Sequence, residues 1–334
     1  MKAIFCSVLL LAFNLPALAA HPIGIVIHGG AGTINQAQMT AQQQQAYEAT
    51  LRHAVDQGYL VLEQGGSSLD AVTKAVTILE DSPLFNAGKG AVYTWDETHE
   101  LDASIMLGQD RNAGAVAGVT NVKNPILLAR AVMEHSAHVM LAGSGAELFA
   151  KQQQLELVEN QYFNTEFRHE ALKRMKQSQQ ALPHQAAVLQ DPNWKMGTVG
   201  AVAIDKAGNL TAATSTGGMT GKRFGRIGDV PVLGAGNFAD NTSCAVSATG
   251  HGEYFIRYQV ASDICARVKY KGITAKLAAE QVLAELAYVG GLGGVIVVDK
   301  AGTLSWAFNT EGMYRAMRGA NTPTLVEIFQ STKN

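Results

Sequence analysis

The amino-acid sequence predicts an α/β protein whose β-sheets pack against one another with helices outside them. The main evidence is two pairs of apolar runs, residues 198–204 with 210–216 and residues 294–298 with 304–308. Each pair is separated by five residues with a Gly in fourth place, which is typical of a β-hairpin. Helical segments lie before and between the hairpins, so a layered α/β domain and a doubly wound parallel sheet both fit the pattern. The hairpins favour antiparallel pairing and therefore the layered domain.

The other elements follow from hydrophobic periodicity and from the positions of Gly, Pro and Asn. A buried strand is expected at 23–27, ending in His28-Gly29-Gly30-Ala31-Gly32, and helical spacing follows at 37–63. Ser67-Ser68-Leu69-Asp70 resembles a helix start, and the helix continues through 71–79 until Pro83 stops it. Further strands are expected at 91–94, 101–106, 113–119 and 139–141, and further helices at 126–133, 146–154, 252–268 and 274–288.

One segment differs in composition from the rest of the chain. Residues 151–195 are rich in Gln, Lys and Glu, and 177–193 are expected to form an exposed, mobile loop. The segment ends abruptly at Met196-Gly197-Thr198, where the first hairpin begins.

The first twenty residues have the pattern of a secretory signal. Lys2 supplies the positive start, residues 4–13 are apolar, and Ala17-Leu18-Ala19-Ala20 is a small-residue cleavage site. The alternative is an N-terminal membrane anchor, but the apolar run is short for a span. We therefore expect a periplasmic or secreted protein with a signal peptide at 1–20 and one mature domain at 21–334.

Charge and cysteine content narrow the function classes. The net charge is −2 with no basic block, which argues against nucleic acid as a partner. No stretch after the signal is apolar enough to cross a membrane.

Cys6 is removed with the signal peptide, so the mature chain keeps Cys244 and Cys265. Export permits a disulfide between them, but we expect two buried free thiols. No HExxH or paired CxxC motif indicates a catalytic metal.

The Gly197-Thr198 bond has the properties of a self-cleavage site. A Thr hydroxyl is a weak nucleophile unless a base lies beside it. A Thr at the start of a chain has its own α-amine as that base, with a pKa of about 7.7–8.0. Such a site needs a cut before the Thr and a rigid strand after it, and both conditions fit Thr198. Taken alone, however, a Gly-Thr pair before a strand more often marks only the start of that strand.

The sequence around this bond, Met196-Gly197-Thr198-Val199-Gly200-Ala201-Val202-Ala203, closely resembles the processing site of the isoaspartyl peptidase/L-asparaginase family, the plant-type asparaginases. The resemblance extends over essentially the whole mature chain in the family's order and is weakest at 151–195. Its other motifs are 28–32, 83–88, 96–103, 114–119, 213–219, 225–229, 234–236, 248–253 and 308–313.

The resemblance implies a set of site residues. Thr198 would be the nucleophile in self-cleavage and in catalysis, with Thr216 beside it and Asn86 holding this region in place. Thr249 and the Gly250 N–H would form the oxyanion hole. Arg226 would bind the substrate α-carboxylate and Asp229 its α-ammonium, while Gly218, Thr249 and Gly252 would complete the substrate site. Without the resemblance, Arg226 and Asp229 read as a surface ion pair, and Thr216 and Thr249 as ordinary strand residues.

The resemblance also implies an architecture and an activity. The fold would be a four-layer αββα sandwich of the N-terminal-nucleophile (Ntn) hydrolase type, cut into an α subunit, 21–197, with a mobile linker at about 176–197, and a β subunit, 198–334. The subunits would assemble as (αβ)2. The enzyme would hydrolyse β-aspartyl dipeptides and L-asparagine without a catalytic cofactor. The rival functions are glycosylasparaginase on the same scaffold and an uncleaved periplasmic amino-acid-binding protein.

A structural sodium ion is the only metal that the resemblance implies. It would be bound by backbone carbonyls of Leu79, Glu80, Ser82, Phe85, Ala87 and Lys89.

Overall fold

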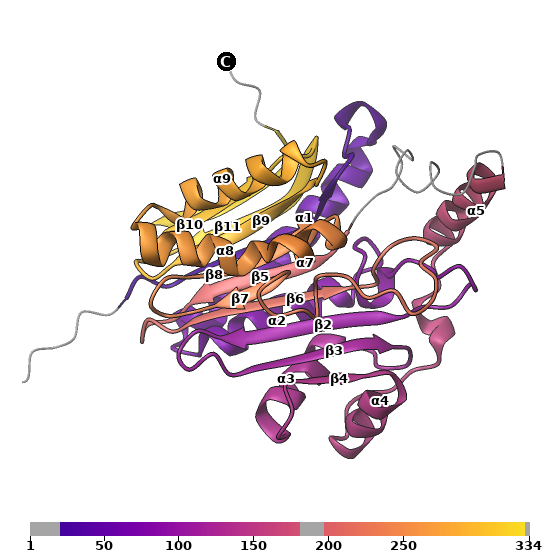
Figure 1. Cartoon of the computed structure of the whole chain (residues 1–334), viewed down its shortest axis with the longest axis horizontal. Helices are drawn as coiled ribbons and strands as arrows, with labels where there is room; N and C mark the ends of the chain where they lie inside the picture. Colours follow the sequence, from indigo (N-terminus) through magenta and orange to yellow (C-terminus); the bar gives the residue numbers. More distant parts are fainter. Residues whose placement is uncertain (1–20, 181–196, 331–334) are drawn as a thin grey trace, which may run out of the picture.

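The computed structural model describes residues 21–180 and 197–330 (Figure 1). The predicted signal peptide, and the part of the predicted loop beyond residue 180, lie outside these ranges. Within them, no helix combines the length and the apolar character that a membrane crossing requires.

Two β-sheets form the centre of the molecule, as Figure 1 shows. The larger has the order β12-β11-β1-β5-β6-β2-β3-β4, and all its neighbours are antiparallel except β3 and β4. Its strands are β1 (Gly24–Gly32), β2 (Leu101–Leu107), β3 (Ala113–Val119), β4 (Met140–Ala142), β5 (Val199–Ile204), β6 (Leu210–Thr216), β11 (Gly312–Gly319) and β12 (Thr322–Phe329). The smaller sheet has the order β10-β9-β8-β7, with β7 (Asn237–Ala239), β8 (Cys244–Gly250), β9 (Gly293–Asp299) and β10 (Leu304–Phe308).

Helices pack on both sheets. The larger sheet contacts α1 (Ala41–Glu63), α2 (Ser68–Glu80), α3 (Pro125–His135) and α4 (Gly143–Gln152). The smaller sheet contacts α8 (Val260–Ala266) and α9 (Ala275–Tyr288). The remaining helices are α5 (Glu166–Gln180), α7 (Gly252–Tyr258), the π-helix η4 (Arg267–Lys271) and the 3-10 turns η1 (Gln36–Gln38), η2 (Gly88–Gly90) and η3 (Asn160–Phe163).

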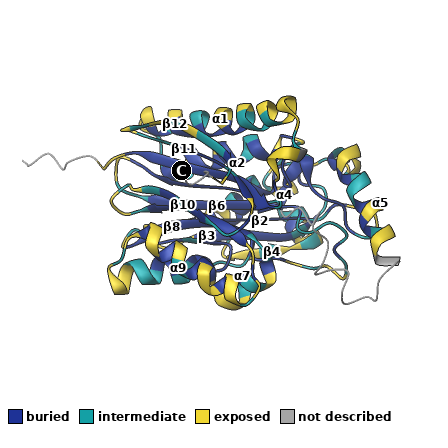
Figure 2. Cartoon of the chain, turned by 90° about the horizontal axis from the view of Figure 1, so that it is seen from above, coloured by how far each residue is buried: buried dark blue, intermediate teal, exposed yellow. Residues whose placement is uncertain are grey.

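Three large apolar clusters hold most of these elements together, and a small fourth one packs α5 against Tyr93. One joins α1, α2 and α3 to the larger sheet, and a second joins α8 and α9 to the smaller sheet. The third lies between the sheets and includes Val26 and Val202 from one and Val298 and Ile296 from the other. Figure 2 shows the same distribution, with buried strands inside and exposed residues on the outer sides of the helices.

Both predicted hairpins are confirmed, and their turns have the same chemistry. Asp205 Oδ1 accepts hydrogen bonds from the backbone N–H groups of Ala207 and Asn209, each 3.0 Å away. Asp299 Oδ1 binds the corresponding two N–H groups of the β9–β10 turn, each at 2.9 Å. The Gly in fourth place has a φ of 82° in both turns, a conformation that favours glycine.

Three predicted elements are corrected. Residues 91–94 form no strand, because the backbone of Val92 is bonded to the side chains of Asn86 and His99 instead of a neighbouring strand. The helix expected at 252–268 is interrupted at Gln259, whose φ of 49° is left-handed, and it divides into α7 and α8. Residues 177–180, which were expected to lie in a loop, belong to α5.

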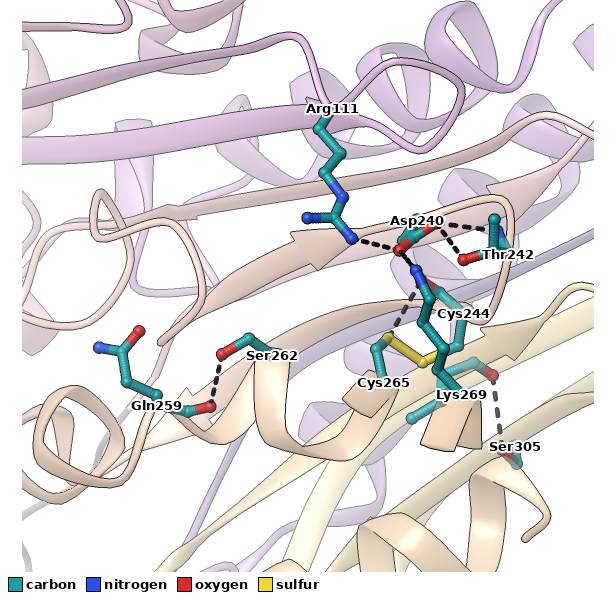
Figure 3. Close-up of a disulfide and its surroundings, with 10 residues drawn as sticks. Arg111, Asp240, Thr242, Cys244, Gln259, Ser262, Cys265, Lys269 and Ser305 are labelled. Carbon is teal, nitrogen blue, oxygen red and sulfur yellow. Dashed lines mark hydrogen bonds and ion pairs between the residues drawn. A yellow bond between two sulfur atoms is a disulfide. The ribbon is translucent and has the colours of Figure 1, made fainter. Parts of the chain in front are cut away.

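The cysteines are also corrected, because Cys244 and Cys265 form a disulfide rather than two free thiols (Figure 3). Their Cα atoms are 5.4 Å apart, since α8 packs directly on β8. Close to the disulfide, Asp240 forms ion pairs with Arg111 and Lys269. The crosslink therefore connects a helix of the outer layer to the strand that ends at Gly250.

Candidate active site

Thr198 lies immediately before β5, in the larger sheet, and only 8% of its surface is exposed. Its hydroxyl donates to Thr216 Oγ1 at 3.1 Å. Thr216 ends β6, the hairpin partner of β5, so the turn at 205–209 fixes the distance between the two threonines. The N–H of Gly218 donates to the same Thr216 oxygen at 3.0 Å.

The carbonyl oxygen of Gly197 accepts two hydrogen bonds. Thr216 Oγ1 donates to it at 3.2 Å and Asn86 Nδ2 at 2.8 Å. Asn86 is buried, and its amide also donates to Gly218 O at 2.7 Å while its Oδ1 accepts from Val92 N. A Cβ on Gly197 would lie 2.8 Å from Asn86 Cβ, so only glycine permits this approach. The structure thus brings together Gly197, Thr198, Thr216 and Asn86 as predicted.

A buried histidine supports Thr198 from the other side. Burial lowers the pKa of His28 to about 3, so the ring is neutral. A neutral ring explains both of its bonds, because Nδ1–H can donate to Thr198 O at 3.0 Å while Nε2 accepts from Ser247 Oγ at 2.9 Å. Ser247 belongs to β8 and also bonds Thr214 Oγ1 of β6 at 2.7 Å. A polar chain therefore connects the two sheets behind Thr198.

Thr249 follows Ser247 by two residues, so both side chains lie on the same face of β8. β8 contacts both β5 and β6. Thr249 is completely buried, and its Oγ1 has no hydrogen-bond partner among the described residues. A Cβ on Gly250 would lie 2.5 Å from the Phe255 ring and 2.6 Å from Leu292 O, so the chain needs a glycine there.

Arg226 and Asp229 lie close together around Gly252. A Cβ on Gly252 would lie 2.8 Å from Arg226 Nη2 and 3.0 Å from Asp229 Oδ1. Arg226 Nε donates to Glu253 Oε1 at 2.9 Å, so the sequence-based alternative of an Arg226–Asp229 surface pair is wrong. Asp229 is buried, and its Oδ2 has no partner in the described part of the chain. Burial raises its pKa to about 7, with the Arg226 charge opposing this shift.

Two charged side chains that sequence reasoning missed lie between Thr216 and Asp229. Asp102 pairs with Thr216 in the β2–β6 register, and its negative charge contributes to the raised pKa of Asp229. Lys222 is buried and lowers the pKa of Asp102, although burial raises it more. A Cβ on Gly218, which has a φ of 80°, would lie 3.2 Å from Lys222 Nζ. The motif at 96–103 includes Asp102 but gave it no role, and no motif includes Lys222, although a charge in an apolar strand, such as Asp102, is itself a signal.

The loop predicted to bind sodium connects α2 to η2. A Cβ on Gly88 would lie 2.4 Å from Glu80 O, and one on Gly90 would lie 2.1 Å from Phe85 O. Carbonyl oxygens therefore crowd this loop so closely that only glycine fits at both positions. Carbonyl oxygens are ligands that hard cations prefer, and a sodium site at this loop stays a prediction. Among the described residues, no cluster of three or more His, Cys, Asp or Glu side chains offers a metal site.

The chain matches known proteins over most of its length. Residues 21–327 match the family model described as asparaginase. The chain is 54% identical over 303 residues to an isoaspartyl peptidase of Escherichia coli (strain K12), covering 90% of this chain and 94% of that protein. It is 53% identical to an isoaspartyl peptidase of Salmonella typhimurium, with 90% and 96% covered, and 45% identical to a putative isoaspartyl peptidase/L-asparaginase of Dictyostelium discoideum, with 87% and 92% covered.

These comparisons identify a hydrolase. Its candidate site holds a buried threonine hydroxyl, a carbonyl that accepts two hydrogen bonds, a buried carboxylate and an arginine. The chain belongs to the isoaspartyl peptidase/L-asparaginase family.

Proposed function

We propose that this protein cuts itself between Gly197 and Thr198 and then uses Thr198 to hydrolyse β-aspartyl dipeptides and L-asparagine. The observation that carries the proposal is the geometry at the bond itself. The Thr198 hydroxyl lies beside Thr216 Oγ1, and the Gly197 carbonyl oxygen accepts from both Thr216 and Asn86. The names of the relatives supply the substrate classes.

In the processing step, Thr198 Oγ1 attacks the Gly197 carbonyl carbon. The carbonyl oxygen becomes negative in the tetrahedral state, and the Asn86 amide and the Thr216 hydroxyl stabilise it by hydrogen bonds. The peptide C–N bond then breaks, the hydroxyl proton ends on the Thr198 amine, and an ester joins Gly197 to Oγ1. Water hydrolyses the ester, which leaves an α subunit ending at Gly197 and a β subunit beginning at Thr198.

In the hydrolytic reaction, the freed α-amine of Thr198 accepts the proton of its own hydroxyl. Oγ1 attacks the side-chain carbonyl of the β-aspartyl unit, and Thr249 Oγ1 with the Gly250 N–H binds the resulting oxyanion. Ammonia or an amino acid leaves with a proton, and water releases aspartate from the ester. The unpartnered Oγ1 of Thr249 supports this assignment, because a buried hydroxyl without a partner is costly unless a ligand completes it.

Arg226 and Asp229 would recognise the two charged groups of the aspartyl unit. The guanidinium binds the α-carboxylate and the Asp229 carboxylate accepts from the α-ammonium. The unpartnered Oδ2 of Asp229 supports this role, as does the position of Gly252 against both side chains. Gly218 would let the backbone approach the ligand from the side of Lys222.

We further propose the finer features of the family for this chain. The two sheets with their helices are the αββα arrangement of Ntn hydrolases, which the three apolar clusters support. Residues 1–20 direct the protein to the periplasm or the outside of the cell, where the Cys244–Cys265 disulfide is stable. The mature domain is 21–334, and the processed subunits assemble as (αβ)2. A sodium ion bound at Leu79–Lys89 carbonyls would be structural and would take no part in the chemistry.

A denaturing gel of the purified protein with N-terminal sequencing tests the processing step. We expect two bands, the smaller beginning at Thr198, and a single inactive band for Thr198→Ala. A single band for the wild type, or a cut Thr198→Ala chain, contradicts self-cleavage. A wild type that stays in one piece and only binds amino acids would instead be the amino-acid-binding protein of the alternative reading.

Parallel assays with β-aspartyl-leucine, L-asparagine and a GlcNAc-asparagine conjugate test the substrate class. We expect hydrolysis of the first two. Preferred hydrolysis of the third substrate would favour the glycosylasparaginase alternative.

A further inference from the structure

A cavity of about 500 Å³ adjoins the bond proposed for cleavage. Gly197 and Asn86 line one end of it. Its other walls come from the loop after β1, from α1 and from the first turn of α5. None of the residues assigned to the aspartyl unit lines it. The cavity therefore shares no lining residue with the aspartyl site.

One wall of this cavity is aromatic. The rings of Tyr47 and Tyr314 stack with centroids 4.3 Å apart, and Phe85 meets Tyr47 edge-on at 5.6 Å. A Cβ on Gly29 would lie 2.4 Å from the Phe85 ring, so the glycine after His28 makes room for it. Such a wall suits an apolar side chain.

Arg168 places a positive charge in the same cavity. Only 6% of its surface is exposed, and its Nε donates to Gly90 O at 2.9 Å. Neither Nη atom makes a hydrogen bond or ion pair with the described residues, although a guanidinium carries five N–H donors. Burial lowers the pKa of Arg168, but an arginine remains charged at neutral pH. A buried cation without a counter-charge is costly unless a ligand supplies one.

The first turn of α5 forms part of the same wall. Thr165 and Phe167 line the cavity with Arg168, and Thr165 Oγ1 accepts from Arg168 N at 3.4 Å. The partial positive charge of a helix N-terminus favours an anion, but this turn also holds the acidic Glu166, which does not line the cavity. The guanidinium of Arg168 is therefore the group that selects a carboxylate here.

We propose that this cavity binds the leaving amino acid of a β-aspartyl dipeptide, with Arg168 on its α-carboxylate and the aromatic wall on its side chain. The inference rests on the proposed function and deepens it. A β-aspartyl dipeptide carries two negative charges and one positive charge, and Arg226 with Asp229 account for one of each sign. The leaving residue has the remaining carboxylate. Once Gly197 has separated from Thr198, the cavity end that it occupies lies next to the nucleophile.

Steady-state kinetics of Arg168→Gln test the proposal, with L-asparagine as the internal reference because its leaving group is ammonia. We expect kcat/KM for β-aspartyl-leucine to fall about 10- to 100-fold, the loss typical of one charge-assisted hydrogen bond. The kcat/KM for L-asparagine should change less than about twofold. Arg168→Lys should recover part of the loss, because it keeps the charge without the planar donor pair.

Two further arms separate carboxylate recognition from a structural role. β-Aspartyl-leucine amide lacks the carboxylate, so the wild type and Arg168→Gln should hydrolyse it equally well. Arg174→Gln removes an exposed charge from the same helix and should leave all three substrates unchanged. A gel of each variant shows whether processing is intact.

The proposal is overturned if Arg168→Gln lowers kcat/KM for all three substrates by the same factor. That result would mean that Arg168 has a structural role or contacts the new C-terminus at Gly197. It is also overturned if no substrate changes. If the wild type hydrolyses neither β-aspartyl-leucine nor L-asparagine, the proposed function fails instead.

Discussion

The two sides of the candidate site differ in how their polar groups are satisfied. Around the Gly197–Thr198 bond, the hydroxyls of Thr198 and Thr216 and the amide of Asn86 all have partners within the chain. On the opposite side, Thr249 Oγ1 and Asp229 Oδ2 are buried and lack a partner among the described residues. The first side is complete before any ligand arrives, as a reaction of the chain with itself requires. The second side is complete only when a ligand supplies the missing donors and acceptors.

If this comparison is right, Asp229→Asn should separate the two reactions most clearly. Hydrolysis of L-asparagine should fall about 100- to 1,000-fold in kcat/KM, because the substrate ammonium loses a buried carboxylate. Processing should be unchanged, since Asp229 makes no contact at the Gly197–Thr198 bond. A gel and an activity assay on the same sample measure both. Equal loss of processing would show that the two sides are not independent.

The pH dependence of kcat/KM for the wild type also tests the role of Asp229. Burial raises the pKa of Asp229 to about 7, so its carboxylate is protonated below that pH and cannot accept from an ammonium. We expect kcat/KM to rise as the pH passes upward through about 7, and kcat to rise less, because a bound ammonium keeps Asp229 ionised. Glu253→Gln removes a negative charge that contributes to the raised pKa and should move the rise to lower pH. An unchanged profile would contradict the assignment.

Asn86→Ala tests the side of the site around the Gly197–Thr198 bond. The Gly197 oxygen loses its 2.8 Å donor, and we expect self-cleavage to slow about 100-fold or more, as for other oxyanion donors. Asn86→Asp is the sharper variant, because it keeps the shape but replaces the donor with a negative charge. The cleaved fraction is followed by gel over time after purification. A variant cut at the wild-type rate would remove Asn86 from the processing step.

The disulfide tests whether the ligand side depends on its supporting layer. Cys244 and Cys265 close a loop with a sequence separation of 21 residues, and Cys265→Ser should lower the free energy of unfolding by about 3 kcal/mol. Denaturant unfolding of wild type and variant measures this. Because the crosslink joins the first residue of β8 to α8 and makes no contact with Ser247 or the Gly197–Thr198 bond, the cleaved fraction should remain that of the wild type. Cys244→Ser is the matched control and should lose the same amount.

Sequence reasoning reached the parts of the molecule that local rules determine. The β5–β6 hairpin was predictable from its Asp205 and Gly208 turn, and this hairpin places Thr198 beside Thr216. The motif around Gly197 came from a family resemblance, because a Gly-Thr pair before a strand is common. No helix was predicted from the sequence at α5. Arg168, Leu172 and Met175 form a buried helical stripe there, but the many Gln and Lys residues around them hide the apolar periodicity.

The groups that sequence reasoning missed depend on tertiary packing. His28 lies in the middle of β1, and only the packing of β8 against it gives it Ser247 as a partner. Lys222 lowers the pKa of Asp102 across 120 residues of sequence. The disulfide likewise depends on α8 packing on β8, and the break at Gln259 that precedes α8 has no proline or glycine to mark it. These contacts join residues that are far apart in the sequence, so the spacing of residues along the chain does not predict them.

The smallest expected effect concerns the polar chain that joins the two sides. Ser247→Ala leaves His28 Nε2 as a buried acceptor without its 2.9 Å donor, which costs about 1–3 kcal/mol. His28 should then hold the Thr198 carbonyl less firmly, so cleavage should slow several-fold while stability falls moderately. Ser305→Ala, on β10, is the control, because its hydroxyl is buried in the smaller sheet but bonds only Val297 O at 3.5 Å. If both variants lower the free energy of unfolding equally and neither slows cleavage, the polar chain from Ser247 to Thr198 contributes only to packing. The two sides of the site would then not be coupled through His28.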